Sequence, residues 1–170
     1  GKFISELAAR EPENFFVAVE GNRSVMLRAM EKINENELEN VVFIPEFIED
    51  LTDWFEDSEV AGIYLNFSDP HPKHYTRKKR LTYRDRLKQY FTVLKNDGIL
   101  TFKTDNTGLF EFTLQELKAA NLKIVDITRD LHASGCTDNI ETEYEAKFSG
   151  LGEKIKRVVL ARAEDKEMEN

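Results

Sequence analysis

The chain has 170 residues, 41% of them hydrophobic and 33% charged, which is the composition of an ordinary globular protein and enough chain for one domain with a sizeable core. No apolar run is long enough to span a bilayer, and the single cysteine, Cys136, excludes an internal disulfide and fits a reducing cytoplasm. The 3 histidines have no further thiol to complete a metal-ligand set, so we expect no metal, and the net charge of −8 argues at first against a nucleic-acid partner.

Short apolar strand candidates alternate along the chain with helical patterns. In chain order we expect helix 3–10, strand 15–20, helix 24–33, strand 40–45, helix 51–55, strand 61–67, helix 81–95, strand 99–105, helix 109–120, strand 123–128, helix 143–148 and strand 156–162. This alternation predicts a single α/β domain over residues 1–170 with a mostly parallel sheet. Because an open doubly wound sheet begins with a strand, the leading helix makes us expect a first strand upstream of Gly1.

Positive charge is concentrated in one segment, from Lys73 to Lys88. The segment holds eight basic side chains and Asp85 as its one acid, a net charge of +7, whereas the rest of the chain carries −15. Such segregation indicates a phosphate-binding patch on an acidic body, although a charge run is more often a solvated helix face. Helix 81–95 shows both features, because an apolar stripe and a basic face run along it.

Carboxylates lie where three of the expected strands end: Glu20, Asp69 and Asp105. Ligands bind beyond the carboxyl ends of strands in folds of this class, and a strand-end acid such as Glu20 can accept hydrogen bonds from ribose hydroxyls. Asp69 stands in a turn that two prolines stiffen, which suits a reacting site as well as a simple strand exit. Asp105 could cap the following helix or face a ligand, and capping is the more common role for an aspartate at such a position.

Residues 142–145 form a different kind of pattern, with Thr142 three residues before Glu145. This spacing is typical of a capping box, which organises a helix start whether or not a ligand is present.

Taken together, these segments resemble the bacterial tRNA (guanine-N7)-methyltransferase family. The resemblance runs from Gly1 to Val159, and its three most specific blocks are residues 64–73 with 78–82 (YLNFSDPHPK and KKRLT), residues 102–106 with 108–111 (FKTDN and GLFE), and residues 142–148 (TEYEAKF). It implies a Rossmann-like class I methyltransferase fold of three layers, in which the sheet is mostly parallel and the last strand antiparallel. It also implies S-adenosylmethionine as cofactor and tRNA as partner.

The resemblance assigns roles to matching positions of this chain. Asp69 corresponds to the catalytic acid, which also borders the cofactor, and Glu20 to the carboxylate for the cofactor ribose. The substrate-binding set corresponds to Lys73, Asp105, Thr142, Glu143, Tyr144 and Glu145, and the RNA-backbone set to Arg77, Lys78, Lys79 and Arg80.

Three departures from the family pattern concern the cofactor site and the proline turn. Most of the glycine-rich cofactor loop is expected upstream of Gly1, which makes Gly1 the last cofactor-binding residue of that loop. A position near the adenine that is usually Asp or Asn is Phe47, whose side chain accepts no hydrogen bond, so backbone at Phe47 and Ile48 or the side chain of Glu46 would substitute. The tryptophan common in the proline turn is His71.

The implied reaction is methyl transfer to guanine N7, an acceptor atom with a lone pair and no proton. Alignment then supplies most of the catalysis, and no strong base is needed. Two alternatives stay open: a methyltransferase of the same fold that acts on a non-RNA substrate, and an RNA-binding remnant without cofactor binding. The basic segment argues against the first, and the four carboxylates Glu20, Asp69, Asp105 and Glu145 argue against the second.

Overall fold

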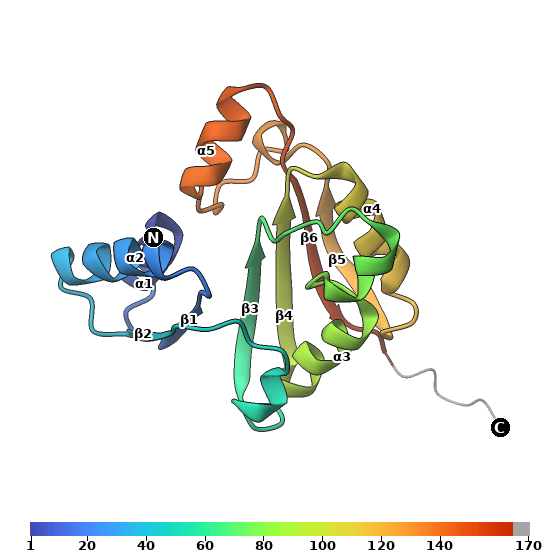
Figure 1. The fold of residues 1–170 in the computed structure, drawn as a ribbon, viewed down its shortest axis with the longest axis horizontal. Helices are drawn as coiled ribbons and strands as arrows, with labels where there is room; N and C mark the ends of the chain where they lie inside the picture. Colours follow the sequence, from blue (N-terminus) through green and yellow to red (C-terminus); the bar gives the residue numbers. More distant parts are fainter. Residues whose placement is uncertain (165–170) are drawn as a thin grey trace. The chain divides into compact units, whose positions relative to one another are not determined.

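The computed structural model describes residues 1–164, and the chain divides into two compact units (Figure 1). The first unit comprises Gly1–Glu49 and Cys136–Gly152, and the second comprises Asp50–Gly135 and the chain from Glu153 onward. None of the helices within residues 1–164 is long and apolar enough to cross a membrane.

The first unit contains three α-helices and a two-stranded parallel sheet. Its elements are α1 (Lys2–Arg10), β1 (Phe16–Val19), α2 (Arg23–Glu35), β2 (Val41–Ile44) and α5 (Glu143–Gly150). Asn22 fixes the start of α2, because its side chain accepts hydrogen bonds from the backbone N–H groups of Ser24 and Val25 at 3.0 and 3.2 Å. The apolar stripes of α1 and α2 bury Leu7, Ala8, Met26, Ala29 and Ile33.

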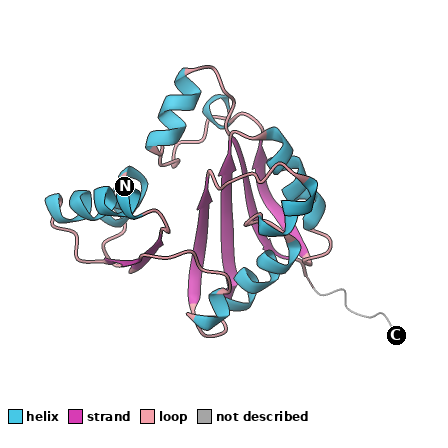
Figure 2. Cartoon of the chain, in the orientation of Figure 1, coloured by secondary structure: helices cyan, strands magenta, loops and turns pink. Residues whose placement is uncertain are grey.

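The second unit is a four-stranded sheet in the order β3-β4-β6-β5, as labelled in Figure 1, and its strands are drawn in magenta in Figure 2. Its strands are β3 (Val60–Asn66), β4 (Leu94–Thr104), β5 (Leu122–Thr128) and β6 (Lys156–Arg162), its α-helices are α3 (Arg84–Val93) and α4 (Thr107–Glu116), and its 3-10 helices are η1 (Leu51–Asp53), η2 (His74–Lys79) and η3 (Leu131–Ala133). Strands β3 and β4 are parallel, and β6 runs antiparallel to both of its neighbours. The expected antiparallel last strand is therefore confirmed.

Helices α3 and α4 share one hydrophobic core with alternate residues of the sheet. The strands contribute Leu100 and Phe102 of β4 and Val158 and Leu160 of β6, all fully buried, and the helices contribute Leu87, Tyr90, Phe91, Leu109 and Phe110. A strand places every second side chain on the same face, so these pairs two residues apart define the covered face. The core thus holds β4 and its C-terminal loop against α4.

The order of helices and strands agrees with expectation, and the bounds differ most at the start of β4, which begins at Leu94 instead of residue 99, and at helix ends. The helix expected over 81–95 begins at Arg84, because Tyr83 is extended and Thr82 is buried with its hydroxyl bonded to Thr113 at 2.7 Å. It ends at Val93, because Leu94 already pairs with Val60 in the sheet. The helix expected over 51–55 is the 3-10 turn η1, and the one expected over 109–120 is α4, from Thr107 to Glu116.

Candidate functional site

The proline-stiffened loop leaves β3 at the edge of the sheet where β4 also ends. The backbone N–H of Phe67 donates to the carbonyl of Lys103 at 2.9 Å, which extends the β3–β4 pairing by one bond. Phe67 and His71 then adopt φ angles of +53° and +39°. Such left-handed conformations cost about 1–2 kcal/mol in residues other than glycine, so other contacts must hold this loop in its shape.

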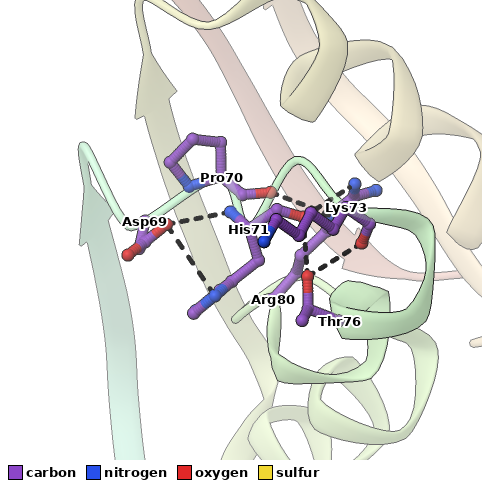
Figure 3. A network of polar contacts seen from close by, with 6 residues as sticks. All are labelled: Asp69, Pro70, His71, Lys73, Thr76 and Arg80. Carbon is purple, nitrogen blue, oxygen red and sulfur yellow. Dashed lines mark hydrogen bonds and ion pairs between the residues drawn. The ribbon is translucent and has the colours of Figure 1, made fainter.

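Asp69 is fixed at one carboxylate oxygen and otherwise open to solvent (Figure 3). Its Oδ1 accepts a hydrogen bond from the backbone N–H of His71 at 2.9 Å and lies 3.8 Å from Nδ1 of the His71 ring. The Asp69 side chain is 70% exposed. A carboxylate held at one oxygen and exposed beyond it can face a ligand without losing its orientation.

The far side of the loop is closed by Thr76 and Arg80 (Figure 3). The Thr76 hydroxyl donates to the carbonyl of Lys73 at 2.8 Å. The Arg80 guanidinium donates from Nε to the carbonyl of Pro70 at 2.9 Å and from Nη2 to the carbonyl of His71 at 3.1 Å. Its other contact is with α4, where the guanidinium carbon lies 4.3 Å from the ring centroid of Phe112.

Asp105 directly follows β4, so the second unit brings Asp69 and Asp105 to the same edge of its sheet. The backbone there is tied down by Lys156, whose Nζ donates to the carbonyl of Asp105 at 2.9 Å and to that of Lys154 at 3.0 Å. Asn106, rather than Asp105, caps α4, since its Oδ1 accepts from the N–H of Leu109 at 2.8 Å. Of the two roles that the sequence leaves open for Asp105, helix capping is therefore wrong, and its carboxylate is not needed to start the helix.

The basic segment divides into exposed and internally bonded cations. Lys73, Lys78 and Lys79 are exposed, and between them stands Tyr75, 77% exposed. Arg77 contacts the ring of His74, with 2.9 Å between Nη1 and Nε2.

Two further arginines of this segment are committed to protein groups. Arg80 bonds the loop carbonyls described above. Arg84 makes a bidentate pair with Glu116, at 2.9 Å from Nε to Oε2 and 2.9 Å from Nη2 to Oε1. These hydrogen bonds hold the pKa of Glu116 below its ordinary value. Of the arginines and lysines expected to meet RNA, the lysines therefore carry the charge that faces solvent.

In the first unit, Glu20 follows β1 at its carboxyl end. Its backbone N–H continues the sheet by donating to the carbonyl of Ile44 at 3.2 Å, and its Oε1 accepts from the N–H of Asn22 at 2.8 Å. The ring of Phe47 lies directly on Gly21: a Cβ at position 21 would be 2.4 Å from the ring, so a side chain there would displace the ring. Phe47 is itself 80% exposed. Glu20 and Phe47 are thus neighbours across Gly21.

Gly1 precedes α1 and accepts from the N–H of Ser5 at 3.1 Å. A Cβ at Gly1 would stand 2.9 Å from the Cα of Ala29, so the chain passes close to α2 at this point.

Residues 142–145 lie at the start of α5. Thr142 is the cap, with Oγ1 accepting from the N–H of Glu145 at 2.9 Å, and this half of the expected capping box is confirmed. Glu145 is fully buried, and its Oε1 accepts from Nδ2 of Asn139 at 2.8 Å. Glu143 is exposed and pairs with Lys32, which lowers the pKa of its carboxyl. Tyr144 stacks on Phe148 at 4.2 Å between ring centroids.

Sequence comparison places the chain among methyltransferases. A family model described as “Putative methyltransferase” matches residues 1–158. The chain is 45% identical over 158 residues to a protein of Staphylococcus carnosus named tRNA (guanine-N(7)-)-methyltransferase, with 93% of this chain and 75% of that protein covered. Proteins of the same name from Geobacillus kaustophilus and Bacillus subtilis are 45% identical over 162 residues (95% and 75% covered) and 43% identical over 157 residues (92% and 74% covered).

Solved structures agree on the fold. An antibiotic-related methyltransferase superposes with a TM-score of 0.65 at 18% identity, covering 94% of this chain and 81% of that one. A SAM-dependent methyltransferase from Aquifex aeolicus superposes with a TM-score of 0.57 at 14% identity, covering 93% and 73%. At these identities the likeness concerns the α/β methyltransferase fold alone.

Proposed function

We infer that this chain, which belongs to the tRNA (guanine-N7)-methyltransferase family, transfers a methyl group from S-adenosylmethionine to N7 of a guanine in tRNA. The observation that carries the proposal is the 45% identity over 93% of the chain to a protein of that name. The exposed, fixed carboxylate of Asp69 at the carboxyl end of β3 supports it, because ligands of α/β folds bind at that end of the strands. The cytoplasm is then the expected location.

Glu20 and Phe47 offer the cofactor a hydrogen-bond acceptor and an apolar surface. A carboxylate offers two oxygens with about four acceptor positions. The Asn22 N–H occupies one of them at Oε1, which leaves acceptor capacity for the two ribose hydroxyls. The exposed ring of Phe47 offers a flat apolar face beside this carboxylate, in place of a polar side chain. When bound, S-adenosylmethionine supplies an electrophilic methyl group on a sulfonium.

Methyl transfer to the guanine requires that the base be oriented and that its developing positive charge be stabilised, and it requires no proton removal. Guanine N7 has a lone pair on the major-groove edge of the base, and the ring becomes positively charged when N7 is methylated. Asp69, with its carboxylate exposed, stabilises that positive charge. Asp105 accepts hydrogen bonds from N1–H and the exocyclic amine of the guanine. Glu145 is fully buried and bonded to Asn139, so we assign it to supporting the start of α5.

We assign the exposed cations of the basic segment to the RNA backbone. Lys73, Lys78 and Lys79 each present a charge to solvent, and phosphate contacts of this kind position an RNA without reading its sequence. Tyr75 stands among them, and an exposed aromatic ring in a basic surface can stack on an unpaired base.

The test is methylation of tRNA transcripts with labelled S-adenosylmethionine, followed by digestion and mass spectrometry of the nucleosides. The expected product is 7-methylguanosine, and its absence would contradict the proposal. Cofactor binding without methylated RNA would support a non-RNA substrate, and tRNA binding without cofactor binding would support an RNA-binding remnant. Once the methylated guanine is mapped, a transcript with adenine at that position is the matched control and should stay unmethylated.

A further inference from the structure

We propose that Arg80 is a positioning residue, which holds the Pro70–His71 peptide so that Asp69 is presented in its working orientation, and not an RNA contact. The inference rests on the proposed function, because it assigns Arg80 a part in the same reaction. It concerns a side chain that the basic character of the segment would otherwise place on a phosphate.

The peptide group between Pro70 and His71 is hydrogen-bonded at both ends. Its carbonyl, from Pro70, accepts from Nε of Arg80 at 2.9 Å, and its N–H, from His71, donates to Oδ1 of Asp69 at 2.9 Å. A peptide group is planar, so fixing its carbonyl also fixes the direction of its N–H. A positive charge at the carbonyl also polarises the group and strengthens the N–H as a donor. Arg80 therefore acts on Asp69 through one rigid plane (Figure 3).

The second bond of Arg80 stabilises the backbone conformation that this arrangement needs. Nη2 donates to the carbonyl of His71 at 3.1 Å, and His71 has a φ angle of +39°. Outside glycine this region is unfavourable, and it persists only where neighbouring contacts determine it. The forked guanidinium spans two successive carbonyls, whereas the single ammonium group of a lysine lacks this planar fork.

The guanidinium is anchored on a helix of the core. Its carbon lies 4.3 Å from the ring centroid of Phe112, which belongs to α4. Asn106 caps the same helix, next to Asp105. Arg80 thus ties the Asp69 loop to the helix that begins beside the second carboxylate. The two bonded carbonyls and the aromatic ring fix the orientation of the guanidinium toward protein groups.

The test compares Arg80→Lys and Arg80→Ala with the wild type in three measurements: kcat and KM for tRNA, the salt dependence of tRNA binding, and solvent exchange of the His71 amide by NMR. Both variants should lower kcat by roughly 10–100-fold, as displacement of a reacting group does, and leave KM for tRNA and the salt dependence unchanged. Exchange of the His71 amide should become faster, because its partner Asp69 is no longer held against it.

Arg162 provides the matched control. Its guanidinium also donates to two backbone carbonyls, those of Phe91 and Leu94, and lies 5.9 Å from the ring centroid of Phe91. It lies at the end of β6 that is remote from the Asp69 loop, because β6 runs antiparallel to β4. Arg162→Ala and Arg80→Ala should both lower the free energy of unfolding, but Arg162→Ala should leave kcat and the exchange of the His71 amide unchanged.

Two outcomes would overturn the inference. One is normal activity in Arg80→Lys together with weaker, less salt-dependent tRNA binding in Arg80→Ala, which is the pattern of a phosphate contact. The other is an unaltered His71 amide in both variants. If instead the wild type methylates no tRNA, the proposed function fails, and the amide exchange still decides whether Arg80 holds the loop.

Discussion

Removing Lys78 and Lys79 together should flatten the salt dependence of tRNA binding without affecting the fold. Both lysines are exposed on η2, whereas Arg80 and Arg84 are hydrogen-bonded to protein groups. Each phosphate contact releases condensed counterions, so the slope of log affinity against log salt changes by about 0.9 per contact on duplex nucleic acid. Replacing both lysines by alanine should reduce the slope by about 1.8.

This slope predicts a difference that binding titrations can measure. Between 50 and 200 mM salt, the affinity of the wild type should fall about 12-fold more than that of the double variant, as follows from a slope difference of about 1.8. The assay is a set of tRNA titrations, by fluorescence anisotropy, at three or more salt concentrations. A control variant with Lys95 and Lys118 replaced by alanine has the same net charge but loses exposed lysines outside the basic segment. Parallel lines for the wild type and the Lys78/Lys79 variant would refute the assignment of these lysines to RNA.

Three further variants test the carboxylates and the cofactor residues. Asp69→Asn should lower kcat by about 10²–10³-fold, because the negative charge is lost while Asn still accepts from the loop, and tRNA affinity measured by titration should not change. Gly21→Ala should displace the exposed phenylalanine ring beside it and weaken cofactor binding by about 3–10-fold in calorimetry, with little loss of folding stability. Glu116→Gln should lower the free energy of unfolding at pH 7 by about 2 kcal/mol, as charged hydrogen bonds contribute. The pKa of Glu116 is lowered in the folded state, so its stabilisation is present above the ordinary value of 4.5 and is lost as the pH falls below it. Denaturation curves of the wild type and the Gln variant should therefore converge in acid, and a constant gap between them would contradict this account of the pair.

The sequence predicted the order of elements, because hydrophobic periodicity is a local signal that short strands and amphipathic helices carry plainly. The ends of the elements were less predictable. Leu94 fits the apolar stripe of a helix, yet in the fold it pairs with Val60, which lies 34 positions earlier. Thr82 is drawn out of the helix by its bond with Thr113. Partners so distant in sequence leave no trace in a local pattern.

The sequence predicted which residues form the candidate site, but not what each of them does there. The proline turn and the strand-end carboxylates were visible, because prolines and acids at the end of an apolar run stand out. The role of Arg80 was hidden, since one arginine within a basic run looks like its neighbours until its carbonyl partners are known. Lys156 was hidden for the same reason, because its partner Asp105 is 51 residues away. Of the three residues Arg80, Lys156 and Asn106, only Asn106 could have been found from the sequence, because asparagine is as good a helix cap as the aspartate before it.

The position of β6 in the sheet sets the order in which this protein can fold during synthesis. β6 lies between β4 and β5, and within residues 1–164 it is the strand with which β5 pairs. The ribosome releases β5 before its partner exists, so β5 and the edge of β4 that pairs with β6 stay unpaired until residues 156–162 emerge. Contacts this distant in sequence form slowly, and the Asp105 backbone receives its bond from Lys156 at the same late step. Completion of the sheet and completion of the proposed substrate edge are therefore one event, and a nascent chain that stops before β6 has neither.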